Sequence, residues 1–290
     1  MSFNVSALTA YVQENTDLLS EAVLNTEELA NVAIRTGISV GTTSINVFSG
    51  TITEQDRDCN MTDSGELAFD QIQVAVDDKA IAQSLCPTTL RDYWMSERMK
   101  PGAAGGEEIP FEAVVVDYVQ KSVSKNISDF IGGQIAAQVT VANGANDSGQ
   151  TVASTLATIL DDLNDLYDAL DERVKMMDDV VIFLSPANHR LAVRAAVAAN
   201  QYHYSFGDGQ GDFYLPGTNA KLVKSSGLVG NAGMFAMPSK YAIFATGLMS
   251  DEENIRLPYD PVSDSVKLRA YYRRGIGFYS VDQMAKNGTL

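Results

Sequence analysis

Carboxylates are the side chains of this sequence whose spacing most resembles a chemical site. Four of them recur at steps of three and four residues, which would place them on one face of a helix. They are Asp161, Asp165, Asp168 and Glu172, with Asp162, Asp171, Asp178 and Asp179 nearby. Grouped carboxylates can bind a divalent cation, but no loop of alternating ligands accompanies them. They lie opposite an apolar stripe, so solvated charge on an exposed helix face is the favoured interpretation.

Histidine, serine and glycine motifs indicate no enzyme class. His189 and His203 are the only histidines, and they match no zinc-site spacing with the cysteines or carboxylates. Ser185 lies at an expected strand-to-helix turn, but the G-x-S-x-G nucleophile pattern is absent. The GDGQGD run at 207–212 fails the dinucleotide-binding pattern, because no strand leads into it. We therefore predict that the protein is not an enzyme and has no catalytic residue, cofactor or metal ligand.

One basic and aromatic cluster stands near the end of the chain. It comprises Arg269, Tyr271, Tyr272, Arg273 and Arg274. Alternate residues of a strand face opposite sides, so Arg273 and Arg274 cannot belong to one patch. Salt bridges to acidic neighbours are therefore favoured over a nucleic-acid surface.

Composition narrows the class of protein. With 290 residues and 45% hydrophobic content, the chain can bury one large core or two modest ones. The net charge of −16 argues against a protein that coats nucleic acid directly, because such proteins need clustered cations. Cys59 and Cys86 cannot build a disulfide framework, and no signal peptide or membrane-length apolar run is visible. We expect a soluble protein made in a reducing cytosol.

An amphipathic helix in the middle of the chain is the element around which the other parts are arranged. Its apolar residues fall at helical steps and are Phe111, Val114, Val115, Tyr118, Val119, Val123, Ile127, Phe130 and Ile131. Pro110 suits the first turn, and Gly132 with Gly133 is expected to end the helix. We predict a helix over 109–131, about 30 Å long at 1.5 Å per residue. After this helix, the pattern of residues 134–142 predicts a strand.

The chain before this helix has apolar stripes but little bulk. The pattern of residues 1–41 predicts that they form an arm with short helices, one of which bears Leu29 and Val32. Residues 42–86 predict a long two-stranded excursion rich in β-branched residues. A lone hairpin of that length is marginal in water, so contact with another surface is expected to stabilise it. The alternative is a plain hairpin folded over its own core. Residues 87–107 predict a short helix and a flexible hinge.

A compact α/β unit begins near residue 152. One helix is predicted over 152–174, followed by a buried strand over Val180–Leu184. Ser185 and Pro186 then predict the cap and first position of another helix. Helix, buried strand and capped helix in this order indicate α/β architecture. Further strands are expected between residue 219 and the end of the chain.

This order of parts resembles the major capsid protein of tailed bacteriophages, which has the Johnson fold of the Hong Kong ninety-seven type. The resemblance is carried by IPFEAVVVDYVQKSVSKNISDFIGG as the spine helix, by SINVFSGTI with LAFDQIQVAV as the E-loop, and by DDVVIFLSPANHRLAV in the axial domain. It covers nearly the whole chain and is one of pattern and order, without a short diagnostic motif. The implied fold class is α+β, with an N-terminal arm, an extended β-hairpin E-loop, a peripheral domain with a long spine helix and an axial α/β domain.

The resemblance implies a division of the chain into five parts. They are the N-terminal arm (1–41), the E-loop (42–86), the peripheral domain with the spine helix (87–150), the axial domain (151–247) and the return to the peripheral domain (248–290). The implied function is a subunit that assembles through pentamers and hexamers into an icosahedral virion shell, in the host cytoplasm and without a membrane. The shell would enclose double-stranded DNA without sequence-specific binding. The expected contacts between subunits are Glu54, Asp56, Arg57, Asp58, Asp63, Glu66, Arg273 and Arg274.

The resemblance also implies partners. These are other copies of the chain, a separate scaffolding protein, a portal and decoration proteins. The chain starts at Met1 directly with the arm, so no fused scaffolding segment is expected. Some members of the family crosslink an E-loop lysine to an asparagine of a neighbour. Here Lys79 is the only lysine before Lys100 and lies toward the base of the excursion, so we predict no crosslinking.

Three alternatives remain open at this point. An encapsulin-like compartment shares the fold but needs a cargo-binding pocket, and the sequence identifies none. A metal-dependent α/β enzyme would use the carboxylates between Asp161 and Asp179. A phage accessory or tail structural protein is the third.

Overall fold

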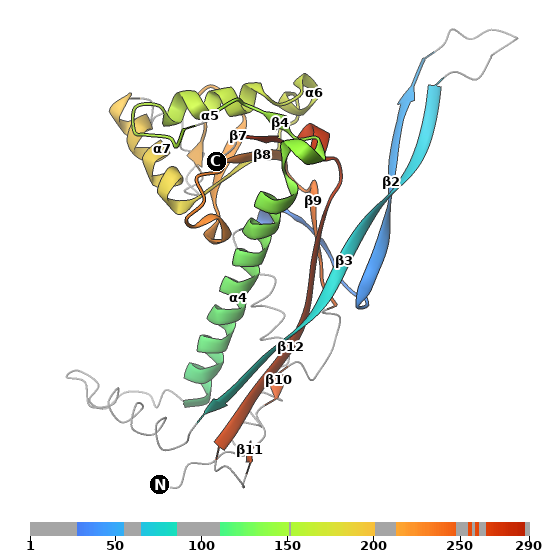
Figure 1. Cartoon of the computed structure of the whole chain (residues 1–290), viewed down its shortest axis with the longest axis vertical. Coiled ribbons are helices and arrows are strands. Elements are labelled where there is room, and N and C mark those ends of the chain that lie inside the picture. Colours follow the sequence, from blue (N-terminus) through green and yellow to red (C-terminus); the bar gives the residue numbers. More distant parts are fainter. Residues whose placement is uncertain are drawn as a thin grey trace, which may run out of the picture.

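The computed structural model describes residues 28–54, 65–85, 111–150, 152–200, 213–247, 255–256, 259–260 and 265–287. A long ribbon of strands and one long helix run side by side, and a compact α/β head lies at one end of them (Figure 1). The predicted helix and hinge of residues 87–107 lie outside the described residues, as do the first 27 residues of the predicted arm. Within the described residues, no helix is long and apolar enough to cross a membrane.

The predicted two-stranded excursion is present as an antiparallel pair. β2 (Gly41–Ile52) pairs with the distal half of β3 (Gly65–Leu85), from Gly41 opposite Val76 to Ile52 opposite Gly65. The proximal half of β3 pairs instead with β12 (Ser265–Phe278). β3 therefore joins the excursion, which we call the hairpin, to the remainder of the described chain, which we call the body.

The long sheet has the strand order β1-β9-β12-β3-β2. Its first two strands, β1 (Ala33–Arg35) and β9 (Ala242–Ala245), run parallel. The short strands β10 (Ile255–Arg256) and β11 (Tyr259–Asp260) also pair with β12. β12 is thus the strand that joins the root of the hairpin to β9 and to the short strands β10 and β11.

The predicted central helix is present but longer than expected. α4 spans Phe111–Gln138, so the predicted end at Gly132-Gly133 and the predicted strand over 134–142 are wrong. The buried stripe of Val119, Val123, Ile127 and Ile131 continues every fourth residue to Ile135 and Val139, and this burial outweighs the weak helix propensity of glycine. Tyr118, predicted to lie in the stripe, is 65% exposed. A short 3₁₀ turn, Val141–Asn143, follows the helix.

Gly132 has a packing role in place of the predicted stop. A Cβ added at Gly132 would lie 2.6 Å from Ser225 Oγ and 2.7 Å from the Cα of Gly227. Gly227 belongs to the 3₁₀ turn η4 (Ser226–Leu228), which therefore packs directly on the helix backbone. Gly133, one position on, has no atom within 4 Å of its Cβ position.

The head contains a second sheet with the order β4-β13-β8-β5-β7-β6. The strands are β4 (Asn146–Asp147), β5 (Val180–Leu184), β6 (Phe213–Tyr214), β7 (Ala220–Lys224), β8 (Phe235–Pro238) and β13 (Ala285–Lys286). The prediction of β5 is confirmed with its bounds. Ser185 Oγ accepts a hydrogen bond from the Asn188 backbone N (3.3 Å) and caps α7 (Pro186–Ala198), as predicted.

The single helix predicted over 152–174 is wrong, because the structure has two helices there. α5 spans Ile159–Asp168 and α6 spans Glu172–Lys175. Asp171 accepts a hydrogen bond from the Arg173 backbone N (2.9 Å), so it caps α6 and ends the continuous helix. The buried stripe survives the break, since Ile159, Leu163, Leu166, Leu170 and Val174 all lie in one core cluster.

The helix predicted to bear Leu29 and Val32 is also wrong. The structure has a 3₁₀ turn, η1 (Leu29–Asn31), followed by β1. Leu29 and Val32 are 2% and 4% exposed, so this part of the arm packs on the body of its own chain. The pairing of β1 with β9 is a long-range contact that overrides the local helical spacing.

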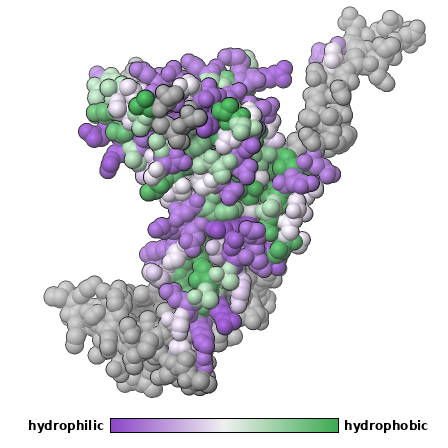
Figure 2. All heavy atoms as spheres, viewed as in Figure 1, coloured by the Kyte–Doolittle hydropathy of each residue, from purple (hydrophilic) through white to green (hydrophobic). Residues whose placement is uncertain are grey.

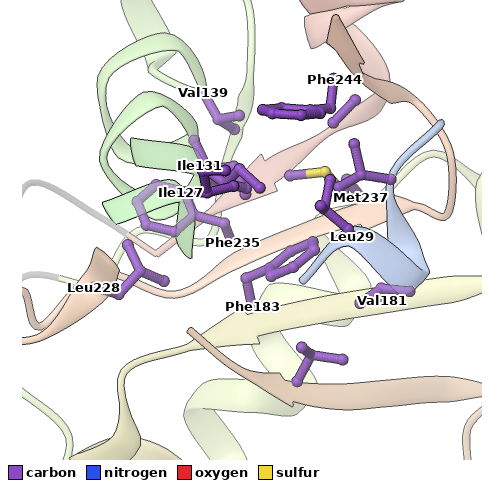
Figure 3. Close-up of a cluster of buried hydrophobic side chains, with 14 of the residues drawn as sticks. Leu29, Ile127, Ile131, Val139, Val181, Phe183, Leu228, Phe235, Met237 and Phe244 are labelled. Atoms are coloured by element: carbon purple, nitrogen blue, oxygen red, sulfur yellow. The ribbon is translucent and has the colours of Figure 1, made fainter. Parts of the chain in front are cut away.

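The head sheet separates two cores. On one face, residues of β5 and β7 pack with α5, α6 and α7, and Ile182 is fully buried there. On the other face, Val181 and Phe183 pack with α4, η1 and β9 in the cluster shown in Figure 3. Every residue of β5 is buried, as expected for a strand covered on both faces. β9 lies in the long sheet and β13 in the head sheet, so the chain passes between the two sheets more than once.

Candidate functional site

Most of the predicted contact residues at the hairpin tip cannot be placed. Asp56, Arg57, Asp58 and Asp63 lie outside the described residues. Glu54 follows β2 and is exposed, and Glu66 lies opposite Thr51 near the start of β3. Contact of these residues with another subunit stays a prediction.

Arg273 of β12 forms an ion pair with the base of the hairpin. It lies opposite Asp78 in the β12–β3 register, and its Nε is 3.8 Å from Asp78 Oδ1. Both side chains are more than a third exposed, so the ion pair contributes little stability. Thr246 Oγ1 donates a hydrogen bond to the Arg273 carbonyl (3.0 Å), which ties the same position to the segment after β9.

Arg274 faces the opposite side of β12 and holds the long helix. Its Nη1 donates to the Asn126 carbonyl oxygen (2.9 Å), and its guanidinium carbon lies 4.3 Å from the centre of the Phe130 ring. A guanidinium over an aromatic face is attracted by the ring quadrupole. The predicted opposite facing of the two arginines and a salt bridge to an acidic neighbour are confirmed. Both have partners within the chain, so their role between subunits stays a prediction.

A groove of about 440 Å³ lies between β3, α4 and the end of β12. Its apolar wall comes from half-buried residues including Ile72, Phe130 and Phe278, and its polar groups include Asp77 and Gln134. Hydrophobic surface reaches the outside near the base of the hairpin (Figure 2). None of the described residues that line the groove is cationic, and such a lining does not favour an anionic ligand.

Lys79 lies at the base of the hairpin, as the sequence indicates. It stands opposite Tyr272 of β12, and its Nζ is 3.2 Å from Asp77 Oδ2. The position is within the paired root of β3 and not near the tip.

The carboxylates on α5 and α6 behave as surface charge. Asp161, Asp165, Asp168 and Glu172 are exposed, and Glu172 pairs with Lys175 at 2.9 Å. That hydrogen bond raises the pKa of the Lys175 amine. Within the part of the chain that the structure describes, no three His, Cys, Asp or Glu residues are placed to hold a metal ion.

The other chemically suggestive residues have structural surroundings. Ser185 is 3% exposed with its hydroxyl on the helix cap, and His189 lies half-buried with its ring edge-on to Phe213. Tyr167 Oη donates to Asn219 Oδ1 (2.8 Å), and burial raises the pKa of the Tyr167 hydroxyl. His203 and the glycine-rich run at 207–212 lie outside the described residues.

Sequence reasoning missed the role of Glu28. Glu28 is 3% exposed, and its carboxylate accepts hydrogen bonds from Ser128 of α4 and Ser226 of η4. No local signal could have found this, because the two partners lie 100 and 198 residues away.

Comparisons with known proteins rest on structure alone. No protein-family model and no curated protein sequence matches the chain. The chain is similar to a virus-like particle from Pyrococcus furiosus, with a TM-score of 0.55 and 11% identity, over 96% of this chain and 99% of that one. It is similar to the capsid of a native GTA particle, with a TM-score of 0.54 and 12% identity, over 92% and 89% of the two chains. It is also similar to the procapsid of satellite phage P4, with a TM-score of 0.52 and 11% identity, over 99% and 91%.

These similarities span almost the whole of each chain in both directions. At 11% to 12% identity they show the fold alone. The predicted fold class is confirmed: the chain has the α+β fold of phage capsid subunits, the Johnson fold.

Proposed function

We propose that this chain is the major capsid protein of a tailed bacteriophage and builds an icosahedral shell around double-stranded DNA. The observation that carries the proposal is the end-to-end match to subunits of capsids and particles. The fold is shared over 96% of this chain and 99% of the chain of the virus-like particle.

The hairpin supports an assembly role. β2 pairs with β3 alone among the described residues, and the pair projects from the body in Figure 1. An isolated two-stranded ribbon is marginally stable in water. We infer that a neighbouring subunit covers it, with the tip residues Glu54, Asp56, Arg57, Asp58, Asp63 and Glu66 at the contact.

The remaining parts of the proposal concern partners. Assembly would proceed through pentamers and hexamers in the host cytoplasm, with a separate scaffolding protein, a portal and decoration proteins. The net charge of −16 suits a shell that encloses DNA without binding specific sequences, because tight phosphate binding needs clustered cations. The five-part division of the chain into arm, E-loop, peripheral domain, axial domain and return belongs to the same proposal.

The shell is proposed to hold together without covalent crosslinks. Lys79 is engaged in the paired root of β3, away from the tip where a neighbour would be reached. Boiled shells on an SDS gel are expected to run as a single band at the monomer position of 31.3 kDa. A ladder of covalent multimers would contradict this.

The alternatives are less well supported. The absence of a three-residue metal group among the described residues gives the enzyme hypothesis no site to use. The encapsulin-like compartment gains no specific support, because no described feature identifies a cargo.

Negative-stain electron microscopy with light scattering tests the proposal. The chain is expressed alone and with the genes beside it. Closed shells, or rings of five or six subunits, are the expected result. A monomer or dimer under every condition would contradict the shell function, and particles that hold a protein cargo without DNA would favour a compartment.

A further inference from the structure

Glu28 joins three segments that are far apart in the sequence. Its Oε2 accepts a hydrogen bond from Ser128 Oγ of α4 (2.5 Å), and its Oε1 accepts one from the Ser226 backbone N of η4 (3.1 Å). The side chain is 3% exposed. One carboxylate therefore bridges the N-terminal segment, the long helix and the turn that follows β7 of the head.

The residues that follow Glu28 are anchored at the same place. Leu29 is buried in the same core cluster as Ile127, Ile131 and Leu228 (Figure 3). β1 then pairs with β9, and the backbone N of Lys240 donates to the Asn31 carbonyl (3.0 Å). The segment 28–35 thus lies across the joint between head and helix and continues into the long sheet.

At one point of the joint between helix and head, backbone meets backbone without side chains between them. Gly132 of α4 faces Gly227 of η4 so closely that a Cβ on either residue would lie within 2.8 Å of the other. The other polar link is exposed, from Ser226 Oγ to Asp129 Oδ1 (2.8 Å). A glycine contact of this kind permits close approach but does not fix an angle. Apolar side chains of α4, including Ile127 and Ile131, also pack with Phe183 of the head, and the Glu28 bridge adds a buried, directional polar tie to this packing.

A buried carboxylate that holds two elements together costs free energy. Burial of a charge costs free energy unless hydrogen bonds compensate, and a well-packed apolar side chain often does as well for stability. Among the contacts that the structure describes, Glu28 has hydroxyl and amide donors and no ion pair. What such a bridge adds is directional geometry, because both donors must be in place at once.

We propose that Glu28, with the segment 28–35, is a clasp that fixes the angle between α4 and the head sheet. Displacement of the chain before Glu28 is transmitted to that angle, because the same segment holds both sides of the joint. If the chain forms a shell, which rests on the proposed function, the joint angle affects how neighbouring subunits meet. Opening the clasp is then expected to give shells of mixed size.

Spin labels on the two sides of the joint test the clasp in the unassembled full-length chain. Lys125 of α4 and Asp161 of α5 are exposed and are changed to cysteine, with Cys59→Ser and Cys86→Ser removing the native thiols. The wild-type joint is expected to give one narrow distance. Glu28→Ala is expected to give a broad or second distance, and Glu28→Gln, which keeps an acceptor for the Ser226 amide, a distance close to wild type.

Hydrogen exchange gives a second readout at a single amide. Because the Ser226 N–H donates to Glu28, its exchange is expected to rise on the order of tenfold in Glu28→Ala. Leu29→Ala is the matched control. It removes a buried side chain from the same segment, so it lowers the thermal midpoint but is expected to leave the distance narrow and the Ser226 amide protected.

Two results would overturn the proposal. One is a Glu28→Ala distance as narrow as that of wild type. The other is equal broadening by Leu29→Ala, which would reduce Glu28 to a general stabilising residue. If Glu28→Ala does not fold, Ser128→Ala removes the donor on the helix side alone and is expected to broaden the distance by less. The measurement does not require shells, so failure of the shell function leaves it intact.

Discussion

The hairpin and the head sheet use the same kind of residues in opposite surroundings. β5 of the head is covered on both faces, and all five of its residues are buried. Among the residues of β2 whose burial is described, no side chain is buried, although half of the residues of the strand are β-branched. Strand propensity therefore does not decide where a strand is stable by itself. The head carries its own core, whereas the hairpin depends on what lies beside it.

The largest expected effect comes from shortening the hairpin. Deletion of Glu54–Ser64 is expected to leave a folded protein that no longer forms shells, because the described residues of the two head cores come from other parts of the chain. Electron microscopy measures shells, and circular dichroism measures folding. A glycine-serine segment of the same length is the matched control, since it keeps the reach of the hairpin and removes its charged side chains. Normal shells from the deletion would remove the reason for giving the hairpin an assembly role.

A pair of isoleucines compares the two regions directly. Ile182 in β5 is fully buried, whereas Ile45 in β2 is half-buried. Ile182→Ala is expected to lower the free energy of unfolding by about 2–5 kcal/mol, as for other large-to-small core changes. Ile45→Ala is expected to cost about 1 kcal/mol or less in the unassembled chain. Denaturant titration measures both, and equal losses would show that the unassembled hairpin is as firmly packed as the head.

Adjacent glycines in α4 test the joint between helix and head. Gly132→Ala is expected to destabilise the protein by about 1–3 kcal/mol, because the new methyl group would overlap Ser225 and the Gly227 backbone. Gly133→Ala is expected to stabilise it by about 0.5–1 kcal/mol, because its Cβ meets open space and alanine favours the helix. Thermal unfolding distinguishes the two signs, and a shift in the same direction for both would argue against the close contact.

The smallest expected effect is a loss of head stability in alkali. The pKa of Tyr167 is raised by burial above its ordinary value of 10.0, and the pKa of Lys175 is raised above its ordinary 10.5 by the hydrogen bond with Glu172. A raised folded pKa means that the stability contribution is complete below the unfolded pKa and is lost as pH rises through the folded pKa. The thermal midpoint is therefore expected to fall above pH 10. Tyr167→Phe should make that fall shallower, and an unchanged slope would exclude Tyr167 as a cause.

Elements with local signals could be predicted from the sequence. Val180–Leu184, the Ser185 cap and the first-turn Pro186 lie where expected, because a short apolar run, a capping hydroxyl and a proline are all encoded by neighbours in the chain. The end of α4 could not be predicted, because the glycine pair that suggests a stop is required at Gly132 by packing against Gly227. β1 could not be predicted either, since its conformation is imposed by β9 more than two hundred residues later.

The candidate site was less predictable than the fold. The alternation of side chains along a strand correctly predicted that Arg273 and Arg274 face opposite sides. Their partners, Asp78 and Asn126, could not be predicted, because they depend on sheet register and on the position of the helix. The partners of Glu28 depend on the same long-range information. The contacts of the hairpin tip depend on other subunits, which the sequence of one subunit does not locate.

The pairing of β3 with β12 determines how the hairpin would respond to mechanical force. Ten residue pairs, from Leu85 opposite Val266 to Val76 opposite Gly275, connect the root of the hairpin to the body. Antiparallel hydrogen bonds run perpendicular to their strands. A pull along the hairpin axis therefore loads this ladder in shear, with its bonds sharing the force, and does not peel them apart one after another. The tip can carry tension while the root stays attached to the body.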